Sequence, residues 1–241
     1  MAVDQAELDF FPLEQVTAEG GSRTLRGLLV AAARETVLAN VRCAERAGLS
    51  VTGVDLASFA VLRAMGRQTA LEVETEALID IGARVTNIVV HSAGMPRFVR
   101  ILLMGGQDVT DAVADRLGVT MEHAEGLKQQ YAHAGPGGEE LATVVQTVTT
   151  IAQDFVDEIR GSLDYYGASN PGAPVERIVL SGGGSRLDGL VERLQTSTRL
   201  PVVGGDPLSA LRVGNTGLDP EQIEFIKPLA AVPVGLALGA I

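Results

Sequence analysis

The segment VERIVLSGGGSRLDGL is the sequence feature that most constrains the fold, because an apolar strand-like run leads directly into three glycines and then into a helical pattern. Gly182, Gly183 and Gly184 allow positive φ angles and a close approach of a ligand, and a helix after them offers free N–H groups to an anion. A tight strand-to-helix turn without a ligand would use the same residues. No Gly-Lys-Ser/Thr follows, so this is not a Walker loop, and Leu187 stands where a dinucleotide fingerprint has its third glycine. The segment predicts either a nucleotide site or an ordinary turn.

A second apolar run, ALIDIGARVTNIVV, contains a carboxylate at Asp80. The pattern predicts a hairpin whose first strand ends in Asp-Ile-Gly. A carboxylate at a strand end can hold Mg²⁺ through water molecules, because magnesium keeps much of its hydration shell. Gly82 leaves room for phosphate oxygens, and the hydroxyl and amides around Thr86 can bind them. Asp-x-Gly is also common in turns, so this segment alone is compatible with a purely structural turn.

The remaining patterns alternate between strands and helices, which makes the class mixed α/β. Strands are predicted at 25–34, 49–56, 85–92, 97–105 and 175–181, and helices at 35–48, 57–66, 108–118, 120–132 and 186–195. Apolar residues at steps of three or four from Leu141 to Leu163 predict one long amphipathic helix that ends near Tyr166. Thr120 is placed to cap a helix. The first 23 residues are predicted to form a loop.

Composition limits the partners and the compartment. The chain carries 19 Lys and Arg against 30 Asp and Glu, a net charge of −11, which disfavours nonspecific binding to nucleic acid or to an anionic bilayer. Cys43 has no partner for an internal disulfide, and His91, His123 and His133 are too scattered to predict a metal cluster. No signal-peptide pattern opens the chain, and the longest apolar run, near the C-terminus, is expected to be too short to span a bilayer. We therefore expect a cytosolic protein.

Glu125 and Lys128 in HAEGLKQQ stand three residues apart, on one face of a predicted helix. They form either a surface ion pair worth about 0.2–0.5 kcal/mol or contacts to the hydroxyls of a ribose. Their place in the chain is informative, because an Asp-x-Gly hairpin, the pair Gly105-Gly106, Glu-x-x-Lys and a strand-Gly-Gly-Gly-Ser turn follow one another. This order resembles the second lobe of the actin-like ATPases, a superfamily that includes actin, sugar kinases and Hsp70.

Longer segments extend the resemblance to nearly the whole chain. Five of these segments are similar to the PilM family of type IV pilus assembly proteins, which are relatives of FtsA. The segments are FFPLEQV, LLVAAARETV, AERAGLSVTGVDLASFAVLRA, VERIVLSGGGSRLDGLVERLQTSTRLPVVGGDPLSAL and PLAAVPVGLALGA. The resemblance implies an α/β, actin-like ATPase (ribonuclease H-like) fold. It divides the chain into an inserted 1C subdomain of the SHS2 type at 1–53, a remnant of the first lobe (1A) at 54–77, and a second lobe (2A/2B) at 78–241 whose last helix returns to the first lobe.

The same resemblance implies that the protein binds ATP and Mg²⁺. Asp80 lies near Mg²⁺ in this interpretation, through water, while Glu125 and Lys128 contact the ribose and base. The implied nucleotide-binding residues are Asp80, Gly82, Thr86, Asn87, Gly105, Gly106, Glu125, Lys128, Gly182, Gly183, Gly184 and Ser185.

The family's first phosphate motif has no match in this sequence. That motif, another strand-Asp-x-Gly hairpin, precedes the family segment similar to FFPLEQV, whereas the chain contains only the Asp-Ile-Gly at Asp80. We interpret the chain as N-terminally incomplete relative to the family, with its first lobe incomplete, and expect at most weak ATPase activity. The segment DLASFAVLRA offers only Asp55 and Ser58 as candidates for a catalytic polar residue, so the catalytic residues stay unassigned.

The implied function is a cytoplasmic nucleotide-binding scaffold that docks the cytosolic tail of a PilN-type inner-membrane protein and thereby lies at the inner face of the membrane. The alternatives are an FtsA-like cell-division protein and a sugar-kinase-type enzyme. FtsA relatives attach to membranes through a basic amphipathic C-terminal helix, whereas here no Lys or Arg follows Lys227, and Pro233 and Gly235 favour a core helix. A sugar kinase needs a substrate base and a complete first lobe, and neither is identified. The sequence leaves the oligomeric state open, a homo-oligomer included.

Overall fold

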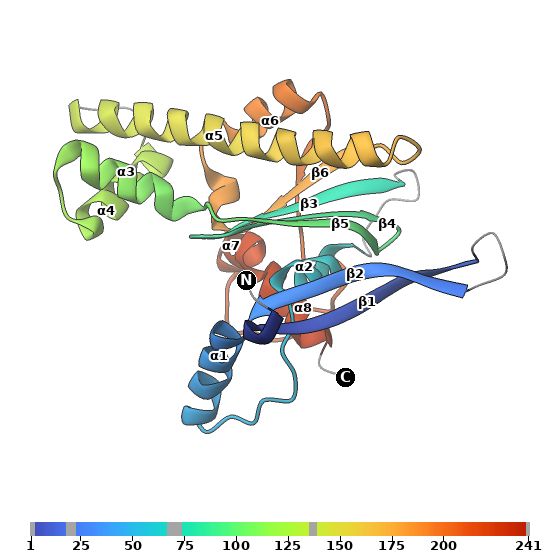
Figure 1. Ribbon diagram of the computed structural model, residues 1–241. Helices are drawn as coiled ribbons and strands as arrows, with labels where there is room; N and C mark the ends of the chain where they lie inside the picture. Colours follow the sequence, from blue (N-terminus) through green and yellow to red (C-terminus); the bar gives the residue numbers. More distant parts are fainter. Residues whose placement is uncertain (1–2, 18–22, 67–73, 135–138, 240–241) are drawn as a thin grey trace. The chain divides into compact units, whose positions relative to one another are not determined.

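The computed structural model describes residues 3–17, 23–66, 74–134 and 139–239, and the chain forms two compact units, Met1–Leu56 and Ala57–Ile241 (Figure 1). The first unit consists of the 3-10 helix η1 (Val3–Gln5), strands β1 (Ala6–Thr17) and β2 (Arg23–Ala33) and helix α1 (Arg34–Arg46). Arg34 Nε donates to Glu7 Oε1 at 2.7 Å, which ties the start of α1 to β1.

Two predictions for the first unit are wrong. Residues 6–17 were expected to be a loop, but they form β1 because β2 lies antiparallel beside them and takes up their backbone groups. The register shifts near Pro12, at an irregularity of the kind that tolerates a residue without an N–H. Residues 49–56 have strand-like sequence, yet the structure assigns them no strand. An apolar segment forms a β-strand only when a neighbouring strand is available to share its backbone hydrogen bonds.

The second unit is built on a five-stranded sheet with the order β5-β4-β3-β6-β7. The strands are β3 (Thr75–Ile81), β4 (Thr86–Ser92), β5 (Met95–Leu102), β6 (Arg177–Ser181) and β7 (Val202–Gly204). Strand β3 is antiparallel to β4 and parallel to β6, and β7 is parallel to β6. The predicted hairpin after Asp80 and the predicted strand before the glycines are therefore confirmed.

The helices of this unit are α2 (Ala57–Met65), α3 (Gly106–Leu117), α4 (Met121–Ala134), α5 (Glu139–Ser169), α6 (Leu190–Thr198), α7 (Pro220–Ile226) and α8 (Ala231–Gly239), with the 3-10 helices η2 (Gly183–Arg186) and η3 (Lys227–Ala230). The long amphipathic helix is confirmed as α5. Thr120 caps α4, because its hydroxyl accepts from the His123 N–H at 3.3 Å. The helix predicted directly after the glycines begins instead as η2, and α6 starts only after Gly189, which adopts φ 69°.

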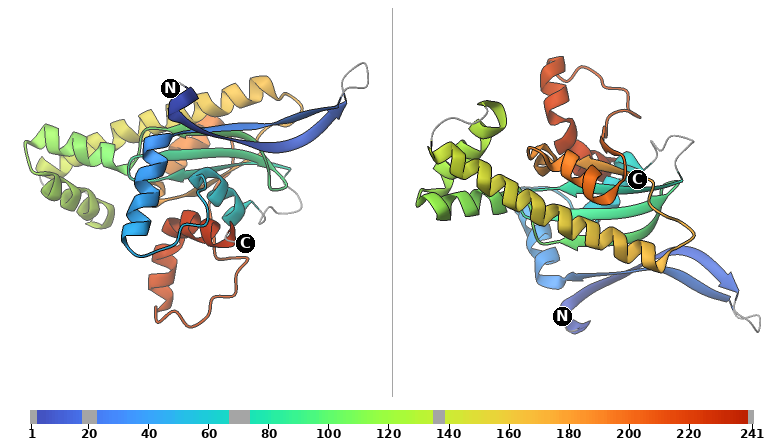
Figure 2. Two further views of the ribbon diagram at one scale, coloured as in Figure 1. Left: turned by 60° about the horizontal axis from the view of Figure 1, so that its bottom comes forward. Right: turned by 90° about the horizontal axis from the view of Figure 1, so that it is seen from above.

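Helices cover both faces of the sheet (Figure 2). Because side chains alternate along a strand, Ile79 points to the face under α5 and α6, where Phe155 and Leu194 are fully buried against it. The next residue on the other face, Leu78, packs under α2 against Val61. Burial of each such side chain contributes about 1.5–3 kcal/mol.

Helices α3 and α4 pack with the first half of α5 in a third apolar cluster, which includes Val109, Leu127 and Val144. Helix α5 therefore contacts both the sheet and the α3–α4 pair (Figure 1). This arrangement leaves the N-terminus of α3 close to the turn that follows β3.

Helix α8 packs closely on α2 because Gly235 has no side chain. A Cβ at this position would lie 1.8 Å from the Ala60 carbonyl oxygen, and Arg63 Nε donates to the Gly235 carbonyl at 3.0 Å.

The stretch Pro220–Gly239, which spans α7, η3 and α8, is 20 residues long and apolar enough to cross a membrane by length and composition alone. The expectation that the longest apolar run is too short is therefore wrong, because α7 and η3 lengthen it.

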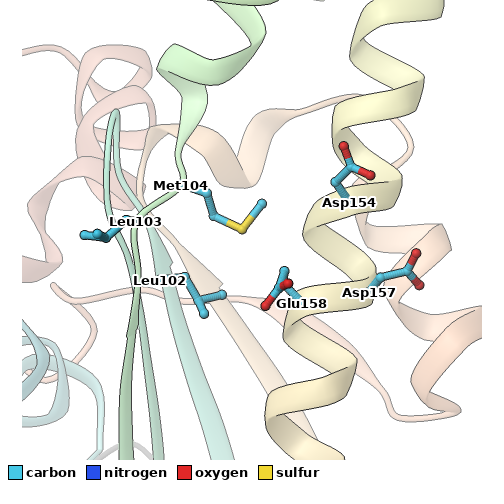
Figure 3. A pocket seen from close by; sticks show the side chains of 6 residues that line it. All are labelled: Leu102, Leu103, Met104, Asp154, Asp157 and Glu158. Atoms are coloured by element: carbon cyan, nitrogen blue, oxygen red, sulfur yellow. The ribbon is translucent and has the colours of Figure 1, made fainter.

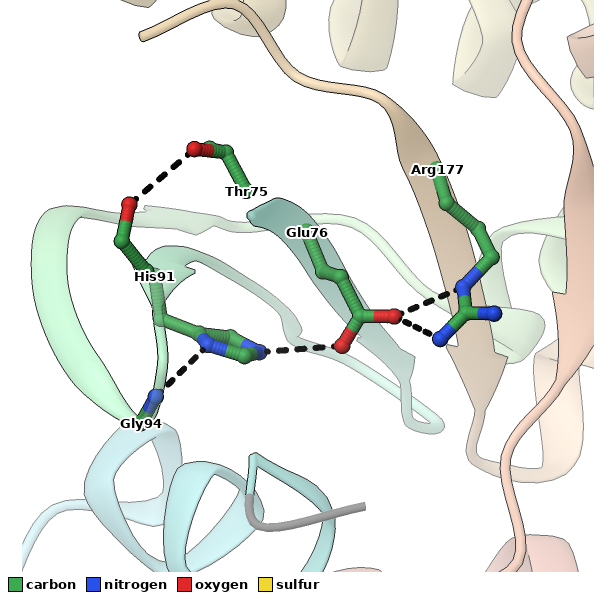
Figure 4. A network of polar contacts seen from close by, with 6 residues as sticks. Thr75, Glu76, His91, Gly94 and Arg177 are labelled. Atoms are coloured by element: carbon green, nitrogen blue, oxygen red, sulfur yellow. Dashed lines mark hydrogen bonds and ion pairs between the residues drawn. The ribbon is translucent and has the colours of Figure 1, made fainter. Parts of the chain in front are cut away.

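Three rows of side chains cross the sheet face that lies under α2, each with one residue from β4, β3 and β6: His91, Glu76 and Arg177; Val89, Leu78 and Val179; Asn87, Asp80 and Ser181. We call the first the charged row and the last the polar row. In the charged row, Glu76 is 1% exposed and accepts from the Arg177 guanidinium, and its second oxygen lies 3.5 Å from His91 Nε2 (Figure 4). The polar row lies at the opposite end of β3.

Candidate functional site

A cavity of about 1000 Å³ opens at the end of the sheet where the polar row lies. Its walls come from the turn after β3, the N-terminus of α3, one face of α4, the glycine turn after β6 and the C-terminal segment. Lining residues from these elements are Asp80, Gly82, Ala83, Gly106, Gln107, Thr110, Glu122, Glu125, Lys128, Gly182, Gly183, Gly184, Arg186, Phe225, Leu229 and Val232.

Asp80 presents a buried carboxylate to this cavity, with 7% of the residue exposed. Ser181 Oγ donates to Asp80 Oδ1 at 2.8 Å, and Asn87 also hydrogen-bonds the carboxylate. Burial raises the pKa of Asp80, and the two hydrogen bonds oppose this only in part. No Lys, Arg or His of the described residues forms an ion pair with it. A buried carboxylate with neutral donors and no cation is suited to a hard metal ion.

The described residues contain no group of three or more His, Cys, Asp or Glu side chains that could hold a metal by themselves. Asp80 can therefore supply only one of the ligands that Mg²⁺ requires. The remaining ligands would be water and oxygens of a bound molecule, which is the usual mode for magnesium at phosphate sites.

The glycines after β3 and β5 bring two turns together. The Gly106 N–H donates to the Gly82 carbonyl at 2.9 Å, and the Gln107 N–H donates to the Ala83 carbonyl at 2.7 Å. A Cβ on Gly105 would lie 2.4 Å from the Ala83 carbonyl, so this glycine is required for close packing and does not line the cavity. Gly82 and Gly106 do line it, where neither has a side chain to exclude a ligand.

Glu125 and Lys128 are more than a surface ion pair. Lys128 Nζ lies 2.6 Å from Glu125 Oε2 and also donates to the Gly106 carbonyl at 3.1 Å, while the Thr110 hydroxyl donates to Glu125. Burial raises the pKa of Glu125, but the hydrogen bonds from Lys128, Thr110 and Gln129 outweigh it and the pKa is lowered. The pair joins α4 to the start of α3 and presents both charges at the cavity.

The three glycines after β6 have different roles. Gly182 adopts φ 81°, and a Cβ there would lie 2.3 Å from the Ile81 carbonyl oxygen. A Cβ on Gly184 would lie 2.3 Å from Ile81 Cγ2, so both positions exclude larger residues for reasons of packing. A Cβ on Gly183 would meet only the Leu229 side chain, at 3.3 Å, beside the cavity. The Ser185 hydroxyl donates to the Gly182 carbonyl and does not line the cavity.

Thr86 and Asn87 also stand outside the cavity lining. The Thr86 hydroxyl is fully buried and donates to the Met104 carbonyl at 2.9 Å, and Asn87 Oδ1 accepts from the Ser58 hydroxyl at 2.9 Å. Ser58 is itself 0% exposed. Asp55 belongs to the first unit, where its side chain accepts from the Leu56 N–H.

The sequence-based prediction missed the wall formed by the C-terminal segment. The Arg186 guanidinium lies 4.2 Å from the centre of the Phe225 ring, and the Gly182 N–H donates to the Pro228 carbonyl at 2.7 Å. A signal for the helix was available in Asp219 and Pro220, since the Asp219 side chain accepts from the Gln222 N–H as an N-cap. Nothing in the sequence indicated that this helix meets the glycine turn.

A second cavity of about 450 Å³ lies between the end of β5 and helix α5 (Figure 3). Leu102, Leu103 and Met104 line one side, and the carboxylates of Asp154, Asp157 and Glu158 line the other. These acids would repel a phosphate group. The larger cavity, with its lysine, glycine turns and cation-free carboxylate, is therefore the candidate site.

Comparison with known families decides the relationship. The family model described as type IV pilus assembly protein PilM matches residues 1–241. The chain belongs to the PilM family. A PilM-PilN type IV pilus biogenesis complex of known structure is 29% identical to it, with a TM-score of 0.82, and the match covers 99% of this chain and 67% of that chain.

Cell division proteins FtsA are also relatives of this chain. That of Bacillus subtilis (strain 168) is 33% identical over 111 residues, covering 46% of this chain and 25% of FtsA. That of Streptococcus pneumoniae is 29% identical over 191 residues, covering 71% and 40%. The PilM-family chain therefore spans less than half of the length of the curated relatives that it matches.

Structures below 25% identity bear on the fold alone. EutJ from Carboxydothermus hydrogenoformans matches with 18% identity and a TM-score of 0.59, covering 86% of this chain and 62% of EutJ. MreB5 of Spiroplasma citri bound to ADP matches with 12% identity and a TM-score of 0.54, covering 87% and 66%. The actin-like ATPase fold expected from the sequence is confirmed.

Proposed function

We propose that the large cavity binds ATP together with Mg²⁺. The observation that carries this proposal is Asp80, a buried carboxylate that faces the cavity with neutral hydrogen-bond donors and without a cation among the described residues. Asp80 would hold Mg²⁺ through water, and the ion would supply the missing positive charge. Gly82 and Gly106 leave room for the phosphates, and a cavity of about 1000 Å³ is large enough for a nucleotide.

Other residues that line the cavity suit the nucleoside. Gly183 offers an open backbone surface beside Leu229, and Arg186 and Phe225 offer flat groups on which a base can stack. Glu125 and Lys128 supply an acceptor and a donor for ribose hydroxyls. A cation held at Asp80 would neutralise phosphate charge, while these residues would bind and position the nucleoside.

We propose a binding role with slow ATP hydrolysis or none. Ser58, one of the two candidates for a catalytic polar residue, is fully buried outside the cavity lining, so it cannot touch a bound phosphate. Asp80 and the surrounding glycines can hold a nucleotide and a metal, which is sufficient for a scaffold whose state depends on occupancy.

We also propose that the protein acts in type IV pilus assembly by docking the cytosolic tail of a PilN-type inner-membrane protein. Membership of the PilM family and similarity to the PilM-PilN complex support this partner. The protein would then lie in the cytoplasm at the inner face of the membrane through that partner. Fluorescence anisotropy with a labelled tail peptide tests the docking, and binding no stronger than that of a scrambled peptide would contradict it.

The nucleotide proposal is tested by isothermal titration of ATP with and without Mg²⁺, using wild type and Gly183→Val. We expect the valine to weaken ATP binding about tenfold or more, because its side chain occupies the surface beside Leu229. Gly183 is the best of the three glycines to change, since a side chain at Gly182 or Gly184 would collide with Ile81 and disturb the fold.

Gly204→Val is the matched control. Gly204 lies in β7, where a Cβ would meet nothing within 4 Å, so valine is tolerated in the strand. Equal ATP affinity for wild type, Gly183→Val and Gly204→Val would remove the adenosine assignment. No ATP binding by wild type would remove the nucleotide proposal itself.

A further inference from the structure

The polar row continues beyond the sheet into helix α2. The Ser58 hydroxyl donates to Asn87 Oδ1 at 2.9 Å, Asn87 stands directly opposite Asp80 in the β3–β4 ladder with its amide beside the carboxylate, and Ser181 donates to Asp80 Oδ1 at 2.8 Å. Ser58 and Ser181 are 0% exposed, Asn87 5% and Asp80 7%. A buried chain of polar groups therefore leads from α2 to the one carboxylate of the β3 end that reaches the cavity.

The direction of the hydrogen bonds gives each member a defined task. An asparagine side chain has one acceptor oxygen and one donor NH₂. Because the Asn87 oxygen accepts from Ser58, its NH₂ is the group that remains to donate to Asp80. An ionised carboxylate can only accept, so Asp80 takes the Asn87 NH₂ as its donor, and the Ser58 hydroxyl holds the amide oxygen at the other side of the group. Without Ser58, this buried amide oxygen loses its donor, and one of the contacts that hold the Asn87 side chain in place is removed.

The position of α2 is itself closely constrained. Its residues Val61 and Met65 are buried against the sheet, and its backbone at Ala60 lies against Gly235 of α8. Ser58 lies two residues before Ala60, in the first turn of α2. The donor that orients Asn87 is therefore held by rigid packing on two sides, which is the requirement for a group that supports a ligand site.

We propose that Ser58 is a positioning residue, which acts through Asn87 to hold the Asp80 carboxylate in the orientation that receives the cation of the bound nucleotide. This inference rests on the proposed binding of ATP with Mg²⁺. It gives Ser58 a role other than contact with phosphate, and it makes the metal side of the cavity depend on the position of α2. Asn87 likewise acts on the carboxylate and not on the phosphates.

The test measures the Mg²⁺ dependence of ATP binding by titration calorimetry for wild type and Ser58→Ala. Removal of groups that orient a metal ligand typically weakens metal affinity about 10- to 100-fold, so we expect about a tenfold loss in apparent Mg²⁺ affinity. ATP affinity measured without Mg²⁺ should be unchanged, because Ser58 does not line the cavity. If Ser58 had only a structural role, Ser58→Ala would change the Mg²⁺ affinity and the Mg²⁺-free ATP affinity to a similar extent.

Ser162→Ala is the matched control. Ser162 is also 0% exposed, but its hydroxyl donates to the Glu158 carbonyl within α5 and takes no part in the polar row. We expect wild-type Mg²⁺ dependence from this variant. The background Asp80→Asn provides a second criterion: if Ser58 acts through Asp80, Ser58→Ala should add no further loss there.

The measurements distinguish a failure of the proposed metal site from a failure of the positioning role of Ser58. If wild-type ATP binding is independent of Mg²⁺, the proposed metal site fails before Ser58 is considered. If wild type requires Mg²⁺ and Ser58→Ala behaves like Ser162→Ala, the positioning role is overturned while the proposed function stands. If Ser58→Ala does not fold, Ser58→Cys replaces it, since a thiol keeps the volume but is a weak donor; Mg²⁺ affinity equal to wild type in that variant would equally overturn the role.

Discussion

The charged row and the polar row occupy the same three strands and the same face of the sheet, and they differ in how a buried carboxylate is compensated. Glu76 is 1% exposed and Asp80 is 7% exposed, so water compensates neither of them. Glu76 receives the Arg177 guanidinium and lies beside the His91 imidazole (Figure 4). Within the part of the chain that the structure describes, Asp80 receives the hydroxyl of Ser181 and the amide of Asn87 and no cation.

The difference separates a structural cluster from a site. A buried acid paired with a guanidinium satisfies its charge within the fold, although the desolvation cost leaves little net gain in stability. An acid with neutral donors alone keeps an unfavourable charge, and burial accordingly raises the pKa of Asp80. A cation that binds beside Asp80 offsets the unfavourable energy of its buried charge. The carboxylate of the polar row is therefore compensated by a ligand, whereas that of the charged row is compensated by a protein side chain.

The largest expected effect is on stability and comes from the charged row. Arg177→Met leaves the Glu76 carboxylate buried without its cation, so we expect the free energy of unfolding to fall by about 3 kcal/mol. Urea denaturation measures the loss. Arg100→Met is the control, because Arg100 is exposed and lies 3.8 Å from an exposed Glu158, a pair worth under about 1 kcal/mol. Equal losses in the two variants would remove the distinction between the rows.

The second effect concerns the polar row, where the expected change in stability is much smaller. A folded-state pKa above the ordinary value means that the charged form of Asp80 is disfavoured in the fold at neutral pH. Asp80→Asn removes this charge with little change in shape, so we expect stability without ligand to stay within about 1 kcal/mol of wild type. ATP binding should lose its Mg²⁺ dependence. If instead the variant unfolds as readily as Arg177→Met, the polar row is a structural cluster like the first.

The smallest effect is a pH dependence within the charged row. Burial lowers the pKa of His91 from 6.5, Glu76 opposes the shift, and Arg177 adds to it. Below the unfolded-state value the unfolded chain takes up a proton that the folded chain does not, so stability is present above about pH 6.5 and is lost as the pH falls below it.

Urea denaturation at about pH 7.5 and about pH 5.5 tests this dependence on wild type and His91→Asn. Asparagine can still accept from the Gly94 N–H, the partner of His91 Nδ1, but does not titrate. We expect a smaller stability loss on acidification for the variant. An identical loss would mean that other groups account for the acid sensitivity.

Much of the second unit could be predicted from sequence because its signals are local. The apolar run that contains Asp80 and the run into Gly182 indicated two central strands, and the three- and four-residue spacing from Leu141 indicated α5. The strand β1 was missed because its sequence alternates weakly and its formation depends on β2. Residues 49–56 form no strand for a related reason: strand formation depends on a pairing partner, which the sequence of a single segment does not reveal.

The predicted site shows the same division. Asp80, Glu125, Lys128 and Gly183 do line one cavity, whereas Thr86 and Ser185 use their hydroxyls on the carbonyls of Met104 and Gly182. The residues that line the cavity and those that bond to the backbone instead occur in similar motifs, so the sequence does not distinguish them. Which of them faces the cavity depends on the register between strands and on turns whose partners lie far away in the chain.

The sequence by itself determined the chemical groups and the local elements of this protein: two apolar strands that end in Asp-Ile-Gly and Ser-Gly-Gly-Gly, a helix with Glu125 and Lys128, and the glycines that permit close backbone approach. Only the tertiary structure decided that, among the described residues, Asp80 has no cationic partner while Glu76 has one, because each partner belongs to a strand or helix remote in sequence. Only tertiary packing brought the C-terminal segment with Phe225 to the glycine turn and Ser58 to Asn87. Local propensity acts between neighbours in the chain, whereas charge compensation and cavity shape depend on contacts that form after the sheet has been assembled.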